Sequence, residues 1–411
     1  MKAFDDFLDM RIDLFGKKIR VVDIFFFSVL LGLGISMRMA LFDYISGDYR
    51  YFLSVWLEEC RQAGGMAYLG IEPGITEAST INYGCMYQYI IVLVFYLSRF
   101  MDELHLLKIV SVIFDVVCAV TVMRLTYMVT AENEKKALMA FGIVMFLPTS
   151  VLNSGAWAQC DSIYTAFVLL GLLHLMKGDD MRLFIYLALA FSFKQQAVFL
   201  VPFLIIMWLK GKVKARYVLV SPVVLFLTLI PALIAGRRLG ELLSIYGKQV
   251  VTYTDLTMNY PSIYTVISSK LDEDYRKLII SAGTIATVAV LGVIAYYVRD
   301  KKFEITREYM ITLAIFTIEV CLFVLPVMHE RYGYLPELMA VAYGVTRYRR
   351  MVICAGLQVI SVITYSRFLF GSTVKDLWPL TLFMFAAIMA LGYDLNKQMN
   401  SREGKYAGIQ G

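Results

Sequence analysis

Charged side chains are scarce in this chain. Asp, Glu, Lys and Arg together make up 18% of its 411 residues, whereas hydrophobic residues make up 59%. Soluble globular domains carry about 25% charged and about 45–50% apolar residues, so this balance excludes an ordinary soluble enzyme. The mean hydropathy of +0.66 agrees with that conclusion. The sequence therefore predicts an all-α, polytopic membrane protein.

Cysteine motifs are also missing. The six cysteines include no CxxC pair and no spacing typical of a metal site, which excludes a zinc-ribbon or thioredoxin-like motif. Cys118, Cys321 and Cys354 fall within apolar runs and are expected to pack as small hydrophobic side chains. The first twenty residues are acidic and amphipathic and lack a small-residue cleavage site, which argues against a removable signal peptide.

The net charge of +6 does not indicate nucleic-acid binding, because Lys and Arg sit in short loops between apolar runs. Such loops are cytoplasmic in most membrane proteins. The basic stretches are 2–20, 133–136, 177–182, 210–216, 299–308, 347–350 and the C-terminal tail. An even number of crossings must then separate neighbouring basic stretches. The apolar runs 84–100 and 108–130 cannot both cross, and 84–100 is the shorter, so we expect it to lie at the outer face.

The even number of crossings between basic stretches predicts about twelve crossings in all, with both termini in the cytoplasm. The expected spans are 21–42, 108–130, 137–152, 162–176, 183–193, 197–209, 217–235, 278–298, 309–327, 334–346, 351–366 and 377–393. The stretch 183–209 is the weakest part of this assignment, because one long helix would be the simpler interpretation. A single membrane domain would cover 1–393, with its first external loop at 43–107, and a cytoplasmic tail would cover 394–411.

In this topology, several polar residues that are not needed to form a loop lie together on the external face of the membrane. Asp43 and Asp48 follow the first span, and either carboxylate at the lipid boundary could act as a general base or simply cap a helix. Trp157, Gln159 and Asp161 alternate along "WAQCD", where Asp161 could cap the next helix or line a cleft.

Two further stretches carry cationic groups. Lys194 lies in "FKQQ", where it could extend to the interface or bind phosphate. "MHERYGY" sets His329, Glu330 and Arg331 side by side between two apolar runs. Glu330 and Arg331 could form an ion pair, but an arginine fork also matches phosphate oxygens.

Together these stretches resemble the GT-C class of multispan glycosyltransferases. The similarity is greatest to glucosyltransferases that use dolichyl-phosphoglucose on N-glycan precursors and to bacterial proteins related to GPI-anchor mannosyltransferases. "SGDYRYFLSVW" resembles the acidic motif that supplies the family's catalytic carboxylate, which the match places on Asp48. The motifs run from 46 to 337 in the family's order. This chain has "NYGCMY" where relatives often have Tyr-Pro-Pro, and Ala158 where Gly is usual.

The resemblance implies a hexosyltransferase that takes its sugar from a polyprenyl phosphate on the external face of a bacterial plasma membrane. Asp48 would be the general base. Lys194, His329 and Arg331 would hold the donor phosphate. Substrate contacts are expected from Tyr83, Trp157, Gln159, Asp161, Gln195 and Glu330. The expected partners are this donor, a glycan or lipid-linked acceptor, and membrane lipid.

No cofactor and no metal ligands are expected, although Asp48 and Asp161 could together bind a divalent cation. A transporter or flippase for a lipid-linked or anionic solute is the alternative function. A non-catalytic scaffold that binds polyprenyl phosphates is a third.

Overall fold

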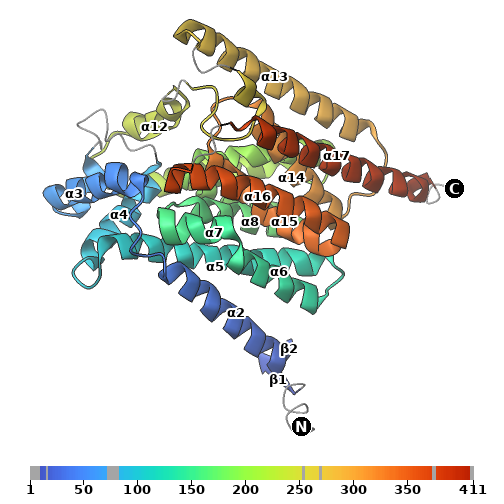
Figure 1. Ribbon diagram of the computed structural model, residues 1–411, viewed down its shortest axis with the longest axis horizontal. Helices are drawn as coiled ribbons and strands as arrows, with labels where there is room; N and C mark the ends of the chain where they lie inside the picture. Colours follow the sequence, from blue (N-terminus) through green and yellow to red (C-terminus); the bar gives the residue numbers. More distant parts are fainter. Residues whose placement is uncertain are drawn as a thin grey trace.

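The computed structural model describes residues 10–14, 17–71, 83–251, 255–267, 271–372 and 376–407. These residues are almost all helical, which confirms the prediction of an all-α membrane protein (Figure 1). The exception is a small antiparallel hairpin of β1 (Arg11–Leu14) and β2 (Lys17–Arg20), which the sequence analysis did not anticipate.

Six helices among the described residues are long and apolar enough to cross a membrane. They are α2 (Val21–Met39), α5 (Glu103–Val129), the continuous η5 (Ala215–Leu219) and α11 (Val220–Ile234), α13 (Glu273–Asp300), α16 (Tyr348–Phe370) and α17 (Trp378–Ala407). A seventh candidate joins α6 (Glu134–Phe146) to α7 (Pro148–Val151) and η3 (Leu152–Trp157) across a 47° bend. The bend falls at Leu147, which is extended because proline follows it.

Shorter helices fill the space between these. They are α8 (Asp161–Met176), α9 (Asp180–Phe193), η4 (Gln195–Leu200), α10 (Val201–Leu209), α14 (Arg307–Val324) and α15 (Tyr334–Thr346). A 14-residue helix is only about 21 Å long, less than the ~30 Å of a bilayer's hydrocarbon core. Every residue of α15 from Tyr334 to Val345 is buried against its neighbours, which include α5, α14 and α16. Helix α15 therefore lies in the core of the bundle.

The basic loops gather at one end of the bundle. Arg350 pairs with Glu308 at 2.5 Å and with Asp394 at 2.7 Å. Lys136 Nζ donates to the carbonyl oxygen of Thr346 at 3.1 Å. These contacts join the α5–α6, α13–α14 and α15–α16 connections to α17, and we call this region the basic end.

The stretch 183–209 forms two helices that run out and back. The backbone N–H of Lys214, just after α10, donates to Asp180 at the start of α9, at 3.1 Å. The turn between α9 and η4 falls at Lys194, whose backbone is extended. The stretch therefore forms two short helices rather than one long helix, and its two expected crossings stay a prediction.

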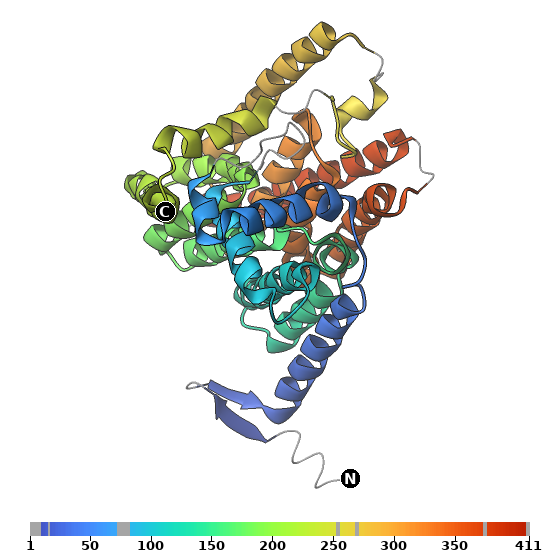
Figure 2. The same cartoon turned by 90° about the vertical axis from the view of Figure 1, so that its left-hand side faces the viewer.

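The opposite end of the bundle carries the short helices of the first long loop. Asp43, after α2, lies 3.0 Å from His105 at the start of α5. Lys108 donates to the carbonyl oxygens of Leu41, Phe42 and Tyr44 at 2.7–3.0 Å. Figure 2 shows α3 (Ser54–Ala63) crossing the front of this end. We call it the α3 end.

Helix α4 (Cys85–Leu97) also lies at the α3 end, against α3 and α5 (Figure 1). The remaining short helices are η1 (Tyr49–Leu53), η2 (Met66–Gly70), α12 (Leu239–Val251), η6 (Ile263–Val266) and η7 (Glu330–Gly333). Helix α4 has 13 residues and is not among the helices of spanning length. Helix α15 is equally short, so this length does not decide whether 84–100 crosses, and that expectation stays a prediction.

The bundle extends beyond residue 393, where the cytoplasmic tail was expected to begin. Helix α17 runs to Ala407. Asp394 pairs with Arg350, and Gln398 donates to Thr312 at 3.1 Å. Met399 is buried. The packed part of the chain is longer than hydropathy alone indicates, because polar contacts continue the helix past its apolar run.

We predict that residues 84–107 stay on the membrane face that carries Asp43. Cysteines introduced at the exposed positions Asp43 and Met101 should react with an impermeant thiol reagent from the same side, and a cysteine at Lys135, beyond the other end of α5, from the opposite side. The native cysteines are all buried and should give little background. Labelling of Asp43 and Met101 from opposite sides would contradict the prediction.

Candidate active site

A cavity of about 250 Å³ opens at the α3 end of the bundle. Segments far apart in the sequence line it: the loop and helix after α2, the start of α4, the end of η3, and η7 between α14 and α15. The lining residues are Asp48, Phe52, Leu53, Trp56, Tyr83, Tyr87, Ala158, Gln159, Met258, Asn259, His329, Glu330, Arg331 and Phe368. Of the residues predicted for the site, Asp48, Tyr83, Gln159, His329, Glu330 and Arg331 meet here.

Asp48 is held from two sides. Its Oδ2 accepts a hydrogen bond from Trp157 Nε1 at 2.8 Å and another from Gln159 Nε2. Tyr83 in turn donates its hydroxyl to Gln159 Oε1 at 2.9 Å, which fixes the orientation of that amide. The side chain of Asp48 is 15% exposed. A carboxylate oriented by two side-chain donors at the wall of a cavity is suited to accept a proton from a bound molecule.

The turn before Asp48 depends on Ser46. Gly47, the residue before Asp48, does not adopt a left-handed conformation. Instead Ser46 Oγ donates to the carbonyl of Trp157 at 2.8 Å and accepts from the N–H of Tyr49 at 3.2 Å. This hydroxyl ties the Asp48 turn directly to the Trp157 segment.

Ala158 turns the chain so that Trp157 and Gln159 both reach Asp48. It adopts a left-handed conformation with φ 63° and ψ 33° at the end of η3. Asn259, across the cavity, is also left-handed, with φ 66°. Such conformations cost about 1–3 kcal/mol in residues other than glycine and cluster at functional sites. Ala158 occupies the position where the resembled family usually has glycine, and the geometry is one that favours glycine.

Arg331 lies among three carboxylates. Its guanidinium is 3.8 Å from Asp48, 3.9 Å from Asp161 and 3.9 Å from Glu330. It also lies over the ring of Trp157, at 5.6 Å from the centroid. Within the part of the chain that the structure describes, Arg331 Nε has no hydrogen-bond partner. The cation is thus held in place while keeping donor capacity for an anion.

Glu330 and His329 are buried beside Arg331, where a segment after α12 covers them. The N–H of Met258 donates to Met328 O at 2.9 Å, and the N–H of Glu330 donates to Met258 O at 3.0 Å. Burial raises the pKa of Glu330 to about 7, an effect that Arg331 opposes. Burial, with help from Arg331, lowers the pKa of His329 well below its usual value, so its imidazole is neutral at pH 7.

Lys194 does not line the cavity, contrary to the expectation that it contacts the donor phosphate directly. Its ammonium pairs with Asp161 at 2.5 Å, and both side chains are almost fully buried. Asn153 Nδ2 donates to the other Asp161 oxygen at 2.9 Å. Lys194 also lies 5.2 Å from the centre of the Tyr83 ring. The extended backbone at Lys194 directs its side chain toward the start of α8, so the ion pair forms behind the cavity wall.

Three other predicted residues lie outside the cavity lining. Trp157 and Asp161 are fully buried, and they reach the site only through their contacts with Asp48 and Arg331. Gln195 points elsewhere, because its amide donates to the carbonyl oxygen of Tyr246 in α12. Asp43 is away from the cavity and 98% exposed. A substrate contact by Gln195 therefore lacks the expected geometry.

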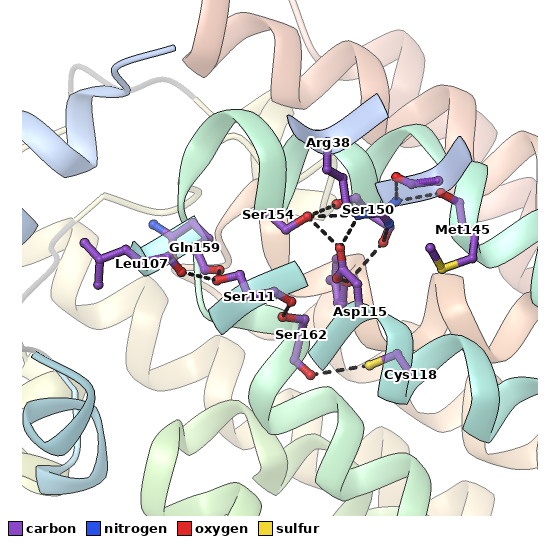
Figure 3. A network of polar contacts seen from close by, with 12 residues as sticks. Arg38, Leu107, Ser111, Asp115, Cys118, Met145, Ser150, Ser154, Gln159 and Ser162 are labelled. Atoms are coloured by element: carbon purple, nitrogen blue, oxygen red, sulfur yellow. Dashed lines mark hydrogen bonds and ion pairs between the residues drawn. The ribbon is translucent and has the colours of Figure 1, made fainter. Parts of the chain in front are cut away.

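A buried polar network supports the site from within the bundle, and the sequence analysis missed it. Figure 3 shows Arg38 of α2 donating to Asp115 of α5 at 2.6 Å and to Ser150 at 2.8 Å. Ser154 Oγ, in η3, donates to the same Asp115 carboxylate at 2.5 Å. Both charged side chains are fully buried. In the sequence, Arg38 and Asp115 each stand inside an apolar run. A charge in that position indicates a buried partner, because an unpaired charge there is costly.

The same network reaches the loop that holds Asp48. Ser111 Oγ donates to the carbonyl of Gln159 at 2.7 Å, and Ser162 Oγ donates to the carbonyl of Ser111 at 2.9 Å (Figure 3). Tyr334, the first residue of α15, donates to Asp115 at 2.7 Å. Helices α2, α5 and α15 are thereby joined to η3, which fixes the position of Trp157 and Gln159.

Among the described residues, no three His, Cys, Asp or Glu side chains lie together as a metal site requires. Asp161, one of the two carboxylates considered for a divalent cation, is engaged by Lys194 and Asn153.

Comparison with known proteins does not assign the site. No protein-family model matches the chain, and no curated protein matches it. The function must therefore be argued from the residues of the cavity.

We predict that Asp115→Ala destabilises the fold strongly, because it leaves the buried Arg38 charge unpaired. Removal of one partner from a buried pair typically costs about 3–5 kcal/mol. The thermal unfolding midpoint in detergent should fall well below that of Asp43→Ala, whose carboxylate is exposed.

The double variant Arg38→Met with Asp115→Leu should lose less stability than the two single variants added together, because no unpaired charge remains. Equal midpoints for Asp115→Ala and the parent would contradict a structural role for the pair.

Proposed function

We propose that the protein is a polyprenyl-phosphate-sugar-dependent hexosyltransferase with Asp48 as its general base. One observation carries the proposal: a carboxylate oriented by Trp157 and Gln159 shares a cavity with the partly unsatisfied guanidinium of Arg331. Transfer of a sugar from a phosphate needs a base for the acceptor hydroxyl and a cation for the leaving phosphate. The cavity offers both groups on facing segments.

In the proposed reaction Asp48 accepts the proton of an acceptor hydroxyl while that oxygen attacks the anomeric carbon of the sugar. The bond from the anomeric carbon to the phosphate oxygen breaks, its electrons stay on the phosphate, and the configuration inverts. Both side-chain donors reach Asp48 Oδ2, so we assign the incoming proton to Oδ1.

Arg331 is assigned to the donor phosphate. Negative charge grows on the phosphate as the bond breaks, and a cation already fixed nearby stabilises it without reorganising. We assign Lys194 a supporting role: it neutralises Asp161, and this leaves more of the Arg331 charge for the phosphate. Neutral His329 is suited to donate a hydrogen bond to phosphate rather than a charge.

The sugar is assigned to the aromatic part of the cavity. Phe52, Trp56, Tyr83, Tyr87 and Phe368 present their rings there. Trp56 packs edge-on against both Tyr83 and Tyr87, which makes these three rings a rigid cluster. The apolar face of a hexose packs against such rings, while polar groups at the rim fix its hydroxyls. Gln159 and Glu330 are the polar groups closest to that role.

We further propose a GT-C fold of twelve crossings, in which the short helices α8, α9, α10, α14 and α15 cross within the bundle. With the basic end in the cytoplasm, the cavity faces the outside of a bacterial plasma membrane. The position of the cavity at one end of the bundle favours an enzyme over a transporter, whose binding site is expected near the bilayer midplane.

Replacement of the base gives the most direct test of catalysis. Asp48→Asn is nearly isosteric, and it should lower transfer from a radiolabelled polyprenyl-phosphate hexose by about 10²–10⁴-fold while donor binding persists. Asp43→Asn is the matched control, because Asp43 is exposed at the end of the same span. Near-normal turnover by Asp48→Asn would overturn its assignment as the base.

The phosphate assignment predicts that Arg331→Lys weakens donor use about tenfold or more, although the charge is kept. Lysine lacks the planar fork, and each factor of ten corresponds to about 1.4 kcal/mol. Donor titration of initial rates in membranes with matched expression measures the effect. If Arg331→Ala used donor as the parent protein does, the anion site would lie elsewhere.

A further inference from the structure

The buried cluster around Arg331 carries more negative than positive groups. Three carboxylates surround the guanidinium within 4 Å, and among the residues that the structure describes only Asp161 has a second cation at contact distance. With all these groups ionised the cluster has a net charge of −1. A phosphodiester would bring another negative charge into the same cavity.

The titratable groups of the cluster around Glu330 and Arg331 come from several elements. They are Asp48 before η1, Tyr83 before α4, Cys160 and Asp161 at the start of α8, Lys194 before η4, His329 and Arg331 of the η7 region, and Tyr365 of α16. Burial lowers the pKa of His329 well below its usual value, so its imidazole is neutral at pH 7. The charge that an anion meets is therefore set by three carboxylates and two cations.

The three carboxylates differ in how well their charge is stabilised. Asp161 accepts from Lys194 and Asn153, and Asp48 accepts from Trp157 and Gln159. Glu330 is 2% exposed, and its Oε1 has no hydrogen-bond partner among the described residues. Its nearest cation is Arg331 at 3.9 Å, which is the group that an incoming phosphate would engage. Asn259 and the backbone N–H of Glu330 stabilise its charge in part, but burial outweighs them, so the Glu330 charge is the least well stabilised of the three. A bound anion would destabilise that charge further.

We propose that Glu330 takes up one proton from solvent when an anionic phosphodiester binds beside Arg331. This inference rests on the anion site of the proposed function. The proton removes one carboxylate charge, so the net charge of the occupied cluster is −1 rather than −2. The neutral acid no longer competes with the phosphate for Arg331, and it gains an O–H that can donate to a phosphate oxygen. Glu330 would thereby make donor affinity depend on pH.

The sign of this dependence follows from the two states of Glu330. Burial raises its pKa to about 7 in the free protein, and a bound anion would raise it further. Below pH 7 the group is already protonated, so affinity should not change with pH. Above pH 7 each binding event must also bind a proton, so affinity should fall by up to tenfold per pH unit.

The test uses dibutyl phosphate, a diester whose own charge does not change between pH 5.5 and 8.5. Its dissociation constant is measured calorimetrically on the full-length protein in detergent across that range. Paired buffers with different ionisation enthalpies give the number of protons taken up. For the parent protein we expect constant affinity at low pH, weakening above pH 7, and uptake approaching one proton.

Glu330→Gln should bind the probe with little pH dependence, at an affinity near the low-pH value of the parent protein, and without proton uptake. Glu319→Gln is the matched control: Glu319 is equally buried but lies in α14, where Tyr260 donates to it at 2.8 Å. This variant should keep the pH dependence of the parent protein.

The outcomes separate the two proposals. Binding to the parent protein above pH 7 without proton uptake would overturn the role of Glu330 and leave the anion site standing. Retention of the full pH dependence by Glu330→Gln would also overturn it, because the proton would then go to another group. An absence of binding at every pH would contradict the anion site and this inference together.

Discussion

The site depends on one constraint: a guanidinium enclosed by carboxylates in a buried cavity. Arg331 lies within 4 Å of Asp48, Asp161 and Glu330, and the three acids come from separate parts of the chain. A charge that is removed from water needs an opposite charge nearby. Each of the three acids therefore holds its own segment of the chain close to Arg331. The distances of 3.8–3.9 Å are longer than good hydrogen bonds. The cluster therefore has unused hydrogen-bonding capacity, which the proposed anion site requires.

A second buried charge pair holds this arrangement from behind. Arg38 and Asp115 join α2 to α5 and, through Ser154, to η3. The strained turn at Ala158 begins where η3 ends, and the two donors to Asp48 flank it. Catalytic side chains need such support, because a side chain that contacts the substrate loses its orientation when its neighbours hold it loosely. The conformation of Ala158 is thus stabilised by the network rather than by local preference.

Much of the site was predictable because its residues interrupt apolar sequence. Asp48, Gln159 and the "HER" triplet stand out as polar groups between hydrophobic runs, and loop charges placed them on one face. Arg38 and Asp115 carry the same signal inside predicted spans and were overlooked. The pairing of Lys194 with Asp161 depends on an extended backbone at one residue, which hydropathy does not encode. Phe52, Tyr87 and Phe368 gave no signal, because 54 phenylalanine and tyrosine residues are spread along the chain.

The proposed function requires that the Arg331 cavity holds the phosphate of a lipid-linked sugar with its anomeric carbon toward Asp48. An experimental structure of the protein with a short-chain polyprenyl-phosphate hexose would show directly where the phosphate binds. We expect the phosphate oxygens within hydrogen-bond distance of the Arg331 guanidinium and the sugar against the rings of Trp56 and Tyr83. A phosphate bound elsewhere, such as near the middle of the bundle, would contradict this placement and favour a transport function.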